Sequence, residues 1–340
     1  MITIGFFTAG LTYRGTEVAI YDYADYNEKI LGNKSIIITI PYEIAKNSNK
    51  DYTPLAYERF SSRFQIEYYN SVENVDEIQN ILDKNSITHL YHLKSGEVEF
   101  PKFLELKRVK YLVHCVFRMR EPHGTNYFAI SNWVAQNTRL DGDTTQYDVV
   151  PHIVKFPLDD TQIDNIIDMR SELGIPESAV VFGRHGGADS FDIPWVRYLI
   201  VDIAKNFPDK YFLFLGTDRF SPPEIKNIIY LEKTLDIVKK IRFIKTCDFM
   251  IHARWRGETF GLACAEFSYL NKPIITFGAS LEKNHLEVLG ENCFKYNEPI
   301  GLAEYFLTLD KDEMKNKKWD MFRRFTPEYV MECFKNAIKI

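Results

Sequence analysis

The sequence has few cysteines, and none of them stands in a paired spacing. The five cysteines are scattered, with no Cys-x2-Cys pair, at Cys115, Cys247, Cys264, Cys293 and Cys333. An odd and scattered set is typical of reduced thiols in a cytosolic protein and argues against a disulfide scaffold. The eight histidines show no zinc spacing, because His89 and His92 would point to opposite faces of one strand. We therefore predict neither disulfides nor a metal site.

The sequence also lacks a long apolar run and an excess of positive charge. No apolar run approaches the roughly 20 residues of a membrane span, and residues 1–7, MITIGFF, are too short for a signal peptide and predict a strand. With 42 basic and 47 acidic residues the net charge is −5, which gives no basic field for nucleic acid. The basic stretch 102–110 is typical of a solvated helix face, with membrane or acidic-acceptor contact as a second interpretation. We expect a cytoplasmic protein with no transmembrane segment and no nucleic-acid partner.

What the chain does contain is enough apolar material for two domains. Of its 340 residues, 45% are hydrophobic and 14% are aromatic. In the first half, predicted strands alternate with helices, the strands at 2–8, 34–40, 64–69, 87–93, 109–117, 127–131 and 147–153 and the helices at 16–31 and 75–84. The alternation predicts a parallel sheet with helices on both faces, whose carboxyl-end loops line a crevice.

A second unit of the same kind is predicted after a connection. Residues 154–175 are polar and have a helical pattern, and we predict that they join the two units. Predicted strands follow at 179–183, 211–215, 227–231, 249–251 and 274–277, with a helix at 234–247 and an amphipathic helix at 327–340. The predicted fold class is therefore α/β with two Rossmann-like domains.

The stretch 249–277, FMIHARWRGETFGLACAEFSYLNKPIITF, holds the most chemistry. An apolar strand leads into a polar loop that contains Arg254. A helix is predicted to begin near Gly261 and to end at Asn271, because the proline two residues later stops it. Glu258 then lies in the loop and Glu266 on the helix.

Glu266 is predicted to face inward. It shares a helix face with Leu262 and Tyr269, and an unpaired carboxylate on a buried face costs several kcal/mol. One hypothesis is an architectural ion pair with an arginine from elsewhere in the fold. The other is a ligand that donates hydrogen bonds to the carboxylate.

The start of the same helix suits an anion. Thr259, Phe260, Gly261 and Leu262 place backbone N–H groups at a helix N-terminus, where a diphosphate binds readily. Gly261 permits close approach of the backbone. A phosphate cradle followed by an inward carboxylate indicates a nucleotide, with Glu266 accepting hydrogen bonds from ribose hydroxyls.

The segment ETFGLACAE, from Glu258 to Glu266, resembles the E-x7-E signature of retaining GT-B glycosyltransferases of the family-four type. The strings GRHGG-x-DSFDIP and IHAR-x2-GETFGL also look like a subgroup of glycosyltransferases shared by bacteria and large DNA viruses. The resemblance implies two Rossmann-like domains that face each other across a cleft. It also implies that Glu258 contacts the donor sugar and that Glu266 holds the ribose.

The resemblance further implies cations on the donor diphosphate. Gly186 and Gly187 form a glycine-rich turn after the predicted strand 179–183, with Arg184 at its mouth, which suits phosphate. The family has a lysine about five residues after this arginine, but Asp189 stands there. Another cation would then have to compensate, either Arg254, Arg256 or Lys94.

In the first unit the resemblance implies residues near the acceptor and the donor sugar. A glycine-bearing loop after the first strand is matched by Gly10 and Gly15, although a plain strand-to-helix turn would also need glycine. A family histidine that borders the donor sugar is matched by His114 or by His123 in the next loop. A lone histidine in an apolar strand is equally typical of a hydrogen-bonded core residue. Lys94 directly follows the predicted strand at 87–93 and is assigned to the acceptor side.

We predict from these features a retaining hexosyltransferase that uses a nucleotide diphosphate sugar, with UDP and GDP not distinguished, and a glycan or glycoconjugate acceptor. Residues 1–156 would form the acceptor-side domain, 157–325 the donor-side domain, and 326–340 a helix that crosses back to the first. Fixed dipoles and cations at the leaving diphosphate would replace a metal, and no cofactor is expected. The aspartates of Asp141-Gly142-Asp143 are more typical of a turn than of a metal motif.

The predicted site residues fall into three groups. The catalytic group is Glu258, His114 and Arg184; the donor-binding group is Glu266, Thr259, Phe260, Gly261, Leu262, Arg254, Gly186 and Gly187; the acceptor-side group is Gly15, Lys94 and His123. Two other hypotheses stay open. One is a nucleotide-sugar-binding protein without turnover, which the absent lysine favours, and the other is a GT-B epimerase or phosphorylase.

Overall fold

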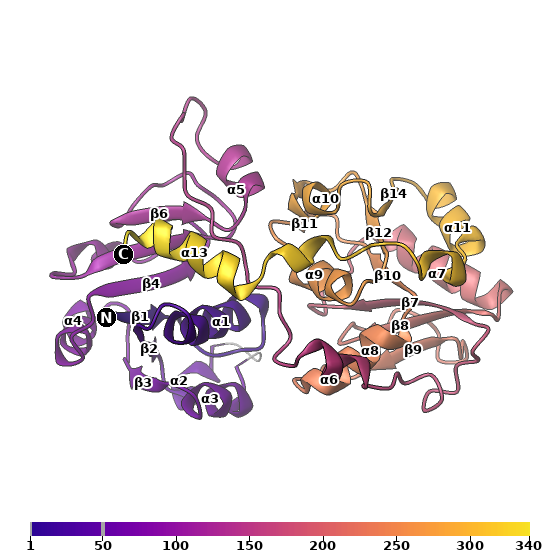
Figure 1. The fold of residues 1–340 in the computed structure, drawn as a ribbon, viewed down its shortest axis with the longest axis horizontal. Helices are drawn as coiled ribbons and strands as arrows, with labels where there is room; N and C mark the ends of the chain where they lie inside the picture. The colour runs from indigo at the N-terminus through magenta and orange to yellow at the C-terminus, as the bar shows by residue number, and fades with distance from the viewer. Residues whose placement is uncertain (1, 49–51) are drawn as a thin grey trace. The chain divides into compact units, whose positions relative to one another are not determined.

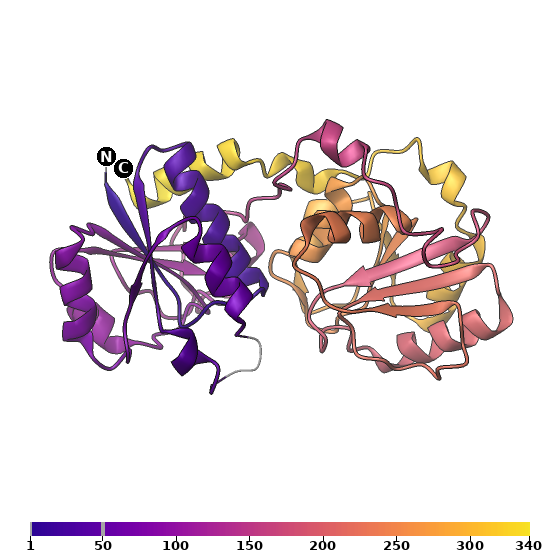
Figure 2. The same cartoon turned by 90° about the horizontal axis from the view of Figure 1, so that it is seen from below.

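The computed structural model describes residues 2–48 and 52–340, which fold into two compact units. Unit 1 consists of Met1–Ile153 and Phe325–Ile340, and unit 2 is Val154–Arg324. Each unit is built on a six-stranded sheet in which every strand pairing is parallel. Helices cover both faces of each sheet (Figures 1 and 2).

The sheet of unit 1 has the strand order β3-β2-β1-β4-β5-β6. Its strands are β1 (Thr3–Phe7), β2 (Lys34–Thr39), β3 (Gln65–Tyr68), β4 (His89–Lys94), β5 (Lys110–Cys115) and β6 (Asn126–Ala129). Its helices before the crossing to unit 2 are α1 (Gly15–Lys29), α2 (Tyr42–Ala45), α3 (Pro54–Ser61), α4 (Val75–Lys84), η1 (Pro101–Glu105) and α5 (Asn132–Asn137). Strands β1, β4 and β5 are buried at nearly every position, without alternation, because both of their faces are covered.

The last helix of the chain, α13 (Pro327–Ile338), belongs to unit 1. Asn126 Nδ2 on β6 donates a hydrogen bond to the main-chain oxygen of Ala337 over 2.8 Å. The ring of Phe334 stacks on Tyr23 of α1, with ring centroids 5.7 Å apart. The apolar face of this amphipathic helix is therefore buried against α1 and β6.

The sheet of unit 2 has the strand order β14-β12-β10-β7-β8-β9. Its strands are β7 (Val180–His185), β8 (Lys210–Leu215), β9 (Ile228–Leu231), β10 (Phe249–His252), β12 (Ile274–Phe277) and β14 (Phe294–Tyr296), with a small pair of β11 (Gly257–Glu258) and β13 (Glu282–Lys283). Its helices are α6 (Asp160–Asp164), α7 (Pro194–Asn206), α8 (Ile237–Thr246), α9 (Leu262–Tyr269), α10 (Asn284–Leu289), α11 (Pro299–Thr308), α12 (Lys311–Met314) and η2 (Met321–Arg324).

Aromatic side chains dominate the core of unit 2. Phe182 on β7 stacks on Phe212 of β8 and Phe249 of β10, with ring centroids 5.4 Å and 5.5 Å away. On the opposite face, a Cβ at Gly183 would lie 2.0 Å from Cys247 Sγ, so glycine is required there for the backbone of β7 to lie against the end of α8. This packing brings the end of β7 close to α8, which matters for the site described below.

Three predicted elements differ in the structure. Of residues 154–175, only Asp160–Asp164 form an α-helix, which a capping box between Asp159 and Gln162 starts. Segment 147–153 makes only an isolated bridge, between Ala129 and Val149, since Pro151 lacks the N–H that a ladder needs. The helix predicted from residue 234 begins at Ile237 instead, because the Asp236 side chain accepts hydrogen bonds from the N–H groups of its first turn.

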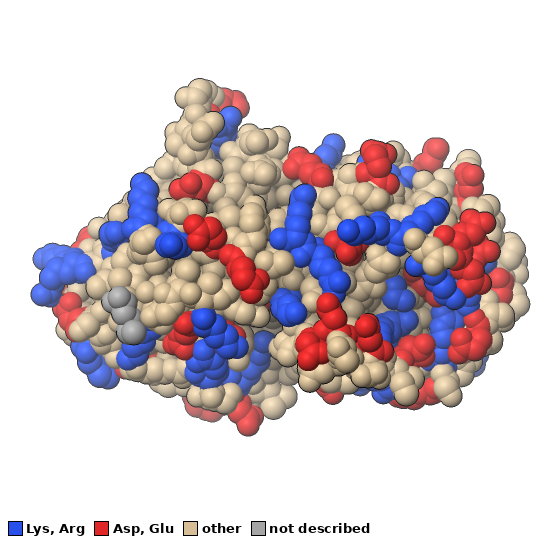
Figure 3. Space-filling model, viewed as in Figure 1, with Lys and Arg blue, Asp and Glu red and all other residues tan. Residues whose placement is uncertain are grey.

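Within residues 2–48 and 52–340, no helix combines the length and apolar character needed to cross a membrane. Basic and acidic side chains are interspersed on the face shown in Figure 3. This mixture agrees with the small net charge of −5.

Candidate functional site

The candidate site lies at the carboxyl edge of the sheet of unit 2. Strands β7, β10 and β12 are adjacent and parallel, so the loops after them emerge on the same edge. Hydrogen bonds join these loops. Asp192 Oδ1 accepts from the Trp255 N–H at 2.7 Å, and the Asp192 N–H donates to the Ala253 oxygen at 3.1 Å. The Leu281 N–H donates to the Trp255 oxygen at 3.4 Å.

Glu258, the first residue of the predicted pair, is held by two partners. Its Oε2 lies 2.8 Å from Arg254 Nη1, and its Oε1 lies 3.3 Å from His252 Nε2. Burial by itself would raise the pKa of Glu258, but the hydrogen bond from His252 and the charge of Arg254 lower it to about 2. The carboxylate is therefore ionised and fixed in orientation at neutral pH.

A buried pair of histidines, His252 and His285, lies beside Glu258. Thr276 Oγ1, on β12, lies 2.9 Å from His252 Nδ1 and 3.1 Å from His285 Nε2. The two imidazole centroids are 4.8 Å apart. Burial, aided by the neighbouring His252, lowers the pKa of His285 to about 3, so this ring is neutral at physiological pH. The shared hydroxyl orients the ring that contacts Glu258.

Gly261 allows the main chain to turn into α9 directly over Glu258. Its φ is +94°, in the left-handed region, and it is the N-cap residue of the helix. A Cβ at this position would lie 3.2 Å from Glu258 Cβ and 3.4 Å from His285 Cβ. The N–H groups of the first turn of α9, beginning with that of Leu262, have no acceptor within the helix. Their role as a diphosphate cradle, with Thr259 and Phe260, stays a prediction.

Glu266, the second residue of the pair, is paired within unit 2. Its Oε1 lies 2.8 Å from Lys240 Nζ on α8, and its Oε2 lies 2.9 Å from His185 Nε2 at the end of β7. Burial would raise the pKa of Glu266, but Lys240 and His185 lower it to about 2. The inward carboxylate thus has a cationic partner, which is a lysine and not the arginine considered from the sequence.

Arg184 is almost completely buried, at 3% exposure. Its Nη2 donates to the Gly187 oxygen and to Ser190 Oγ, both at 2.6 Å, and its Nη1 donates to Thr217 Oγ1. Burial lowers the pKa of Arg184 to about 10, which leaves it protonated at neutral pH. The turn containing Gly186 and Gly187 therefore wraps around the Arg184 guanidinium, so the positive charge of this group is buried directly under the turn.

The arginines of the loop after β10 have separate partners. Arg254 is paired with Glu258, and Arg256 Nε lies 2.7 Å from Glu282 Oε1. Asp189, in the position of the family lysine, is exposed. Lys240 is a cation beside the predicted ribose residue that the sequence interpretation did not consider.

The predicted residues of unit 1 have different surroundings. His114 is completely buried, and its Nδ1 lies 2.7 Å from the Tyr91 hydroxyl. Burial lowers its pKa well below the ordinary value. His114 thus has the surroundings of a hydrogen-bonded core histidine, which is the alternative considered from the sequence, and its role beside the donor sugar stays a prediction. Every residue of its strand, β5, after Lys110 is buried, so both faces of the strand are covered.

Lys94 and His123 do lie together. Lys94 Nζ is 3.5 Å from His123 Nε2 and 3.4 Å from Glu99 Oε2, and it donates to the main-chain oxygen of Glu97. Burial lowers the pKa of both Lys94 and His123. Gly15 is the first residue of α1, as expected for a strand-to-helix loop. The acceptor role of these residues stays a prediction.

Sequence reasoning missed several contacts of the site. His252 and His185 are the last residues of β10 and β7, so their places at strand ends were a usable signal. Lys240 and Thr276 gave no signal, because each reaches the site only through packing between elements distant in sequence.

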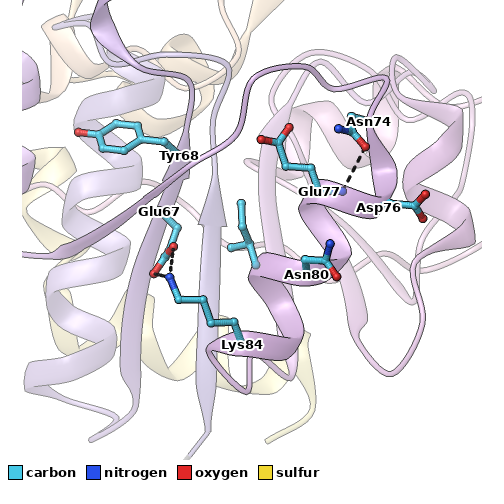
Figure 4. A pocket seen from close by; sticks show the side chains of 8 residues that line it. Glu67, Tyr68, Asn74, Asp76, Glu77, Asn80 and Lys84 are labelled. Carbon is cyan, nitrogen blue, oxygen red and sulfur yellow. Dashed lines mark hydrogen bonds and ion pairs between the residues drawn. The ribbon is translucent and has the colours of Figure 1, made fainter.

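A surface hollow of about 520 Å³ lies in unit 1 between β3 and α4 (Figure 4). It is lined by Glu67, Tyr68, Asn74, Asp76, Glu77, Asn80, Ile81 and Lys84. Lys84 Nζ crosses it to Glu67 Oε2 at 3.1 Å. The hollow contains none of the predicted site residues, so we do not assign the chemistry to it.

Comparison with solved structures identifies the class of fold. The chain aligns over 100% of its length with all of HepE from Anabaena in complex with UDP-glucose, at a TM-score of 0.71 and 12% identity. A glycosyltransferase from Rickettsia africae gives a TM-score of 0.67 at 16% identity, with 99% of each chain covered. Sucrose-phosphate synthase from Thermosynechococcus elongatus gives 0.62 at 12% identity, covering 99% of this chain and 96% of that one.

These similarities, together with the two parallel six-stranded sheets, show that the chain has the GT-B fold, as predicted. No protein-family model and no curated protein sequence matches the chain.

Proposed function

We propose that the chain transfers a sugar from a nucleotide diphosphate sugar to an acceptor hydroxyl, with retention of configuration at the anomeric carbon. The observation that carries this proposal is the pair Glu258 and Glu266. Both carboxylates are held ionised at the carboxyl edge of a GT-B sheet, Glu258 on β11 just before α9 and Glu266 on the second turn of α9. HepE, of the same fold, was solved with UDP-glucose, and also with UDP and glucose.

In this proposal the donor lies along α9. Glu266 accepts hydrogen bonds from the ribose hydroxyls, and the N–H groups at the start of α9 bind the diphosphate. Arg184 places a buried positive charge near the same diphosphate, and such fixed charges stabilise a leaving phosphate without requiring a metal. Lys240 adds a cation on the side of Glu266.

The proposed role of Glu258 follows from its contacts. A nucleophilic carboxylate must reach the anomeric carbon directly. Both oxygens of Glu258 are already engaged, one by Arg254 and one by His252. We therefore assign Glu258 to orienting the sugar hydroxyls, and the leaving phosphate to taking the acceptor proton on the same face.

The test is a thermal-shift panel of UDP- and GDP-sugars, followed by a transfer assay with the ones that bind. A ligand at 100 times its Kd should add about 2.7 kcal/mol of stability. Slow hydrolysis of the donor to nucleoside diphosphate, in the absence of acceptor, would support a transferase. Binding without any turnover of the donor would favour the second hypothesis, a nucleotide-sugar-binding protein, which Asp189 in place of lysine supports. Phosphate-dependent turnover would indicate a phosphorylase.

A further inference from the structure

An exposed apolar surface lies beside the candidate site in unit 2. Trp255, in the loop after β10, is 54% exposed, and Leu281, in the loop after β12, is 65% exposed. The main-chain N–H of Leu281 donates to the main-chain oxygen of Trp255, which brings the two loops together. Single exposed apolar residues are common on proteins. Two large ones on neighbouring loops beside the candidate site point to a binding surface.

The indole ring is held in place. The main-chain N–H of Trp255 donates to Asp192 Oδ1, and the indole ring stacks on Phe277 with a centroid distance of 5.6 Å and an interplanar angle of 26°. Phe277 is itself buried, at 3% exposure. One side of the ring thus rests on the core, and the rest of the side chain is open. A rigid aromatic ring of this kind loses little conformational entropy when a ligand binds.

The position of the ring relates it to the sugar end of the proposed donor. The preceding residue, Arg254, contacts Glu258. Trp255 is three residues from Glu258, so their Cα atoms are at most about 11 Å apart. Glu266, the proposed ribose residue, lies eight residues beyond Glu258, on α9. The nucleoside therefore belongs toward Glu266, and the indole toward the sugar.

We propose that Trp255, Leu281 and the carboxylate of Asp192 form a subsite for a saccharide acceptor. This inference rests on the proposed function and names its acceptor as a carbohydrate. The subsite lies in unit 2 and is proposed in addition to the acceptor-side residues predicted in unit 1. A pyranose ring presents an apolar C–H face and an edge of hydroxyls. The face packs on the indole and on Leu281, and the hydroxyls donate to the exposed Asp192 carboxylate.

The surroundings favour a saccharide over a lipid acceptor. An acyl chain gains affinity in proportion to the apolar area that it covers. Here charged side chains flank the apolar surface, namely Asp192, Arg254, Arg256 and Glu282. A sugar uses both kinds of surface, whereas an acyl chain uses only the indole and Leu281.

The test is saturation-transfer NMR with neutral trisaccharides of glucose, mannose and N-acetylglucosamine, each titrated with and without UDP. Wild type should bind at least one of them. Trp255→Ala should weaken this binding at least tenfold, Trp255→Phe should retain most of it, and Leu281→Ser should weaken it several-fold. Trp133→Ala, at the partly exposed tryptophan of α5, is the matched control and should have no effect. The affinity for UDP, measured by calorimetry, should be the same in all variants.

Several results would overturn the assignment. If no trisaccharide binds wild type that binds UDP, the acceptor is not a saccharide, although the donor proposal stands. A loss of UDP affinity in Trp255→Ala would place the nucleobase on the ring and remove the acceptor subsite. If Leu281→Ser and Trp255→Ala both bind the trisaccharide as tightly as wild type does, saccharides bind elsewhere. If neither UDP nor GDP binds, the proposed function fails, and the titrations without nucleotide still decide the role of Trp255.

Discussion

Lys240 Nζ lies 2.8 Å from Glu266 Oε1 and joins α8 to α9 at the point where the ribose is proposed to bind. His185 Nε2 approaches the other oxygen at 2.9 Å. A nucleotide that binds to Glu266 must therefore share this carboxylate with two nitrogen groups. Because each carboxylate oxygen has more than one acceptor position, sharing is possible without breaking the ion pair.

We predict that Glu266→Ala weakens binding of the cognate nucleoside diphosphate by about 1.5–3 kcal/mol, as expected for lost hydrogen bonds to a charged group. Calorimetry measures the change. Glu287→Ala, at an exposed glutamate of α10, is the control and should bind as wild type does. Unchanged affinity in a folded Glu266→Ala protein would leave Glu266 as a purely architectural partner of Lys240.

Arg184→Ala should abolish most of the turnover, because the buried guanidinium is the proposed charge beneath the diphosphate. Arg184→Lys keeps a positive charge and should retain more activity, although it loses the bonds to Thr217 and Ser190. Initial rates under saturating donor are the measurement. If Arg184→Ala keeps more than about a tenth of the activity, its activation free energy has risen by less than about 1.4 kcal/mol. The role would then shift to another cation. Lys240→Ala would then be the next variant to measure.

Glu258→Gln should keep some activity, while Glu258→Ala should lose far more, because the amide still offers an oxygen to orient the sugar. Proton NMR of the first-formed product determines the anomeric configuration. A product with the donor's configuration is expected. The opposite anomer would contradict both retention and the orienting role of Glu258. A covalent glycosyl intermediate on Glu258, detected by mass spectrometry, would contradict the orienting role alone.

Stability should fall as the pH is lowered. The folded-state pKa values of Glu258 and Glu266 are about 2, below the ordinary 4.5, so their contribution is present above pH 4.5 and is lost as pH falls toward 2. His285, with a folded-state pKa of about 3 against an ordinary 6.5, acts in the same direction, since the unfolded chain takes up its proton first. Urea unfolding at pH 7, 5.5 and 4 measures the slope.

A matched variant assigns part of this pH dependence. Glu266→Gln has no carboxylate to titrate, so its free energy of unfolding should change less than that of wild type between pH 5.5 and pH 4. An equal slope in the two proteins would mean that Glu266 does not have a depressed pKa in the folded state.

The sequence alone was sufficient for the fold class, and it supplied the pair Glu258 and Glu266 on which the candidate site is built. The alternation of apolar strands with helices is a local pattern, and it predicts two parallel sheets because only parallel strands need such crossovers. The spacing of Glu258 and Glu266, and the glycine at position 261, are also local. A helix that starts at Leu262 follows from the residues around it, and this helix places Glu266 on its second turn, after the strand that ends at Glu258.

The tertiary structure decided which groups surround these carboxylates. Lys240 reaches Glu266 from α8, and Thr276 joins His252 to His285 from a neighbouring strand. These contacts depend on the strand order and on how closely the elements pack, neither of which is encoded in the spacing of neighbouring residues.

Burial was likewise decided only by the fold. His114 and Trp255 are both single aromatic side chains in the sequence, but helices cover both faces of β5 and bury His114, while the loop after β10 leaves Trp255 open. A sequence pattern shows which face of a strand or helix a residue occupies. Whether another element covers that face depends on segments far along the chain.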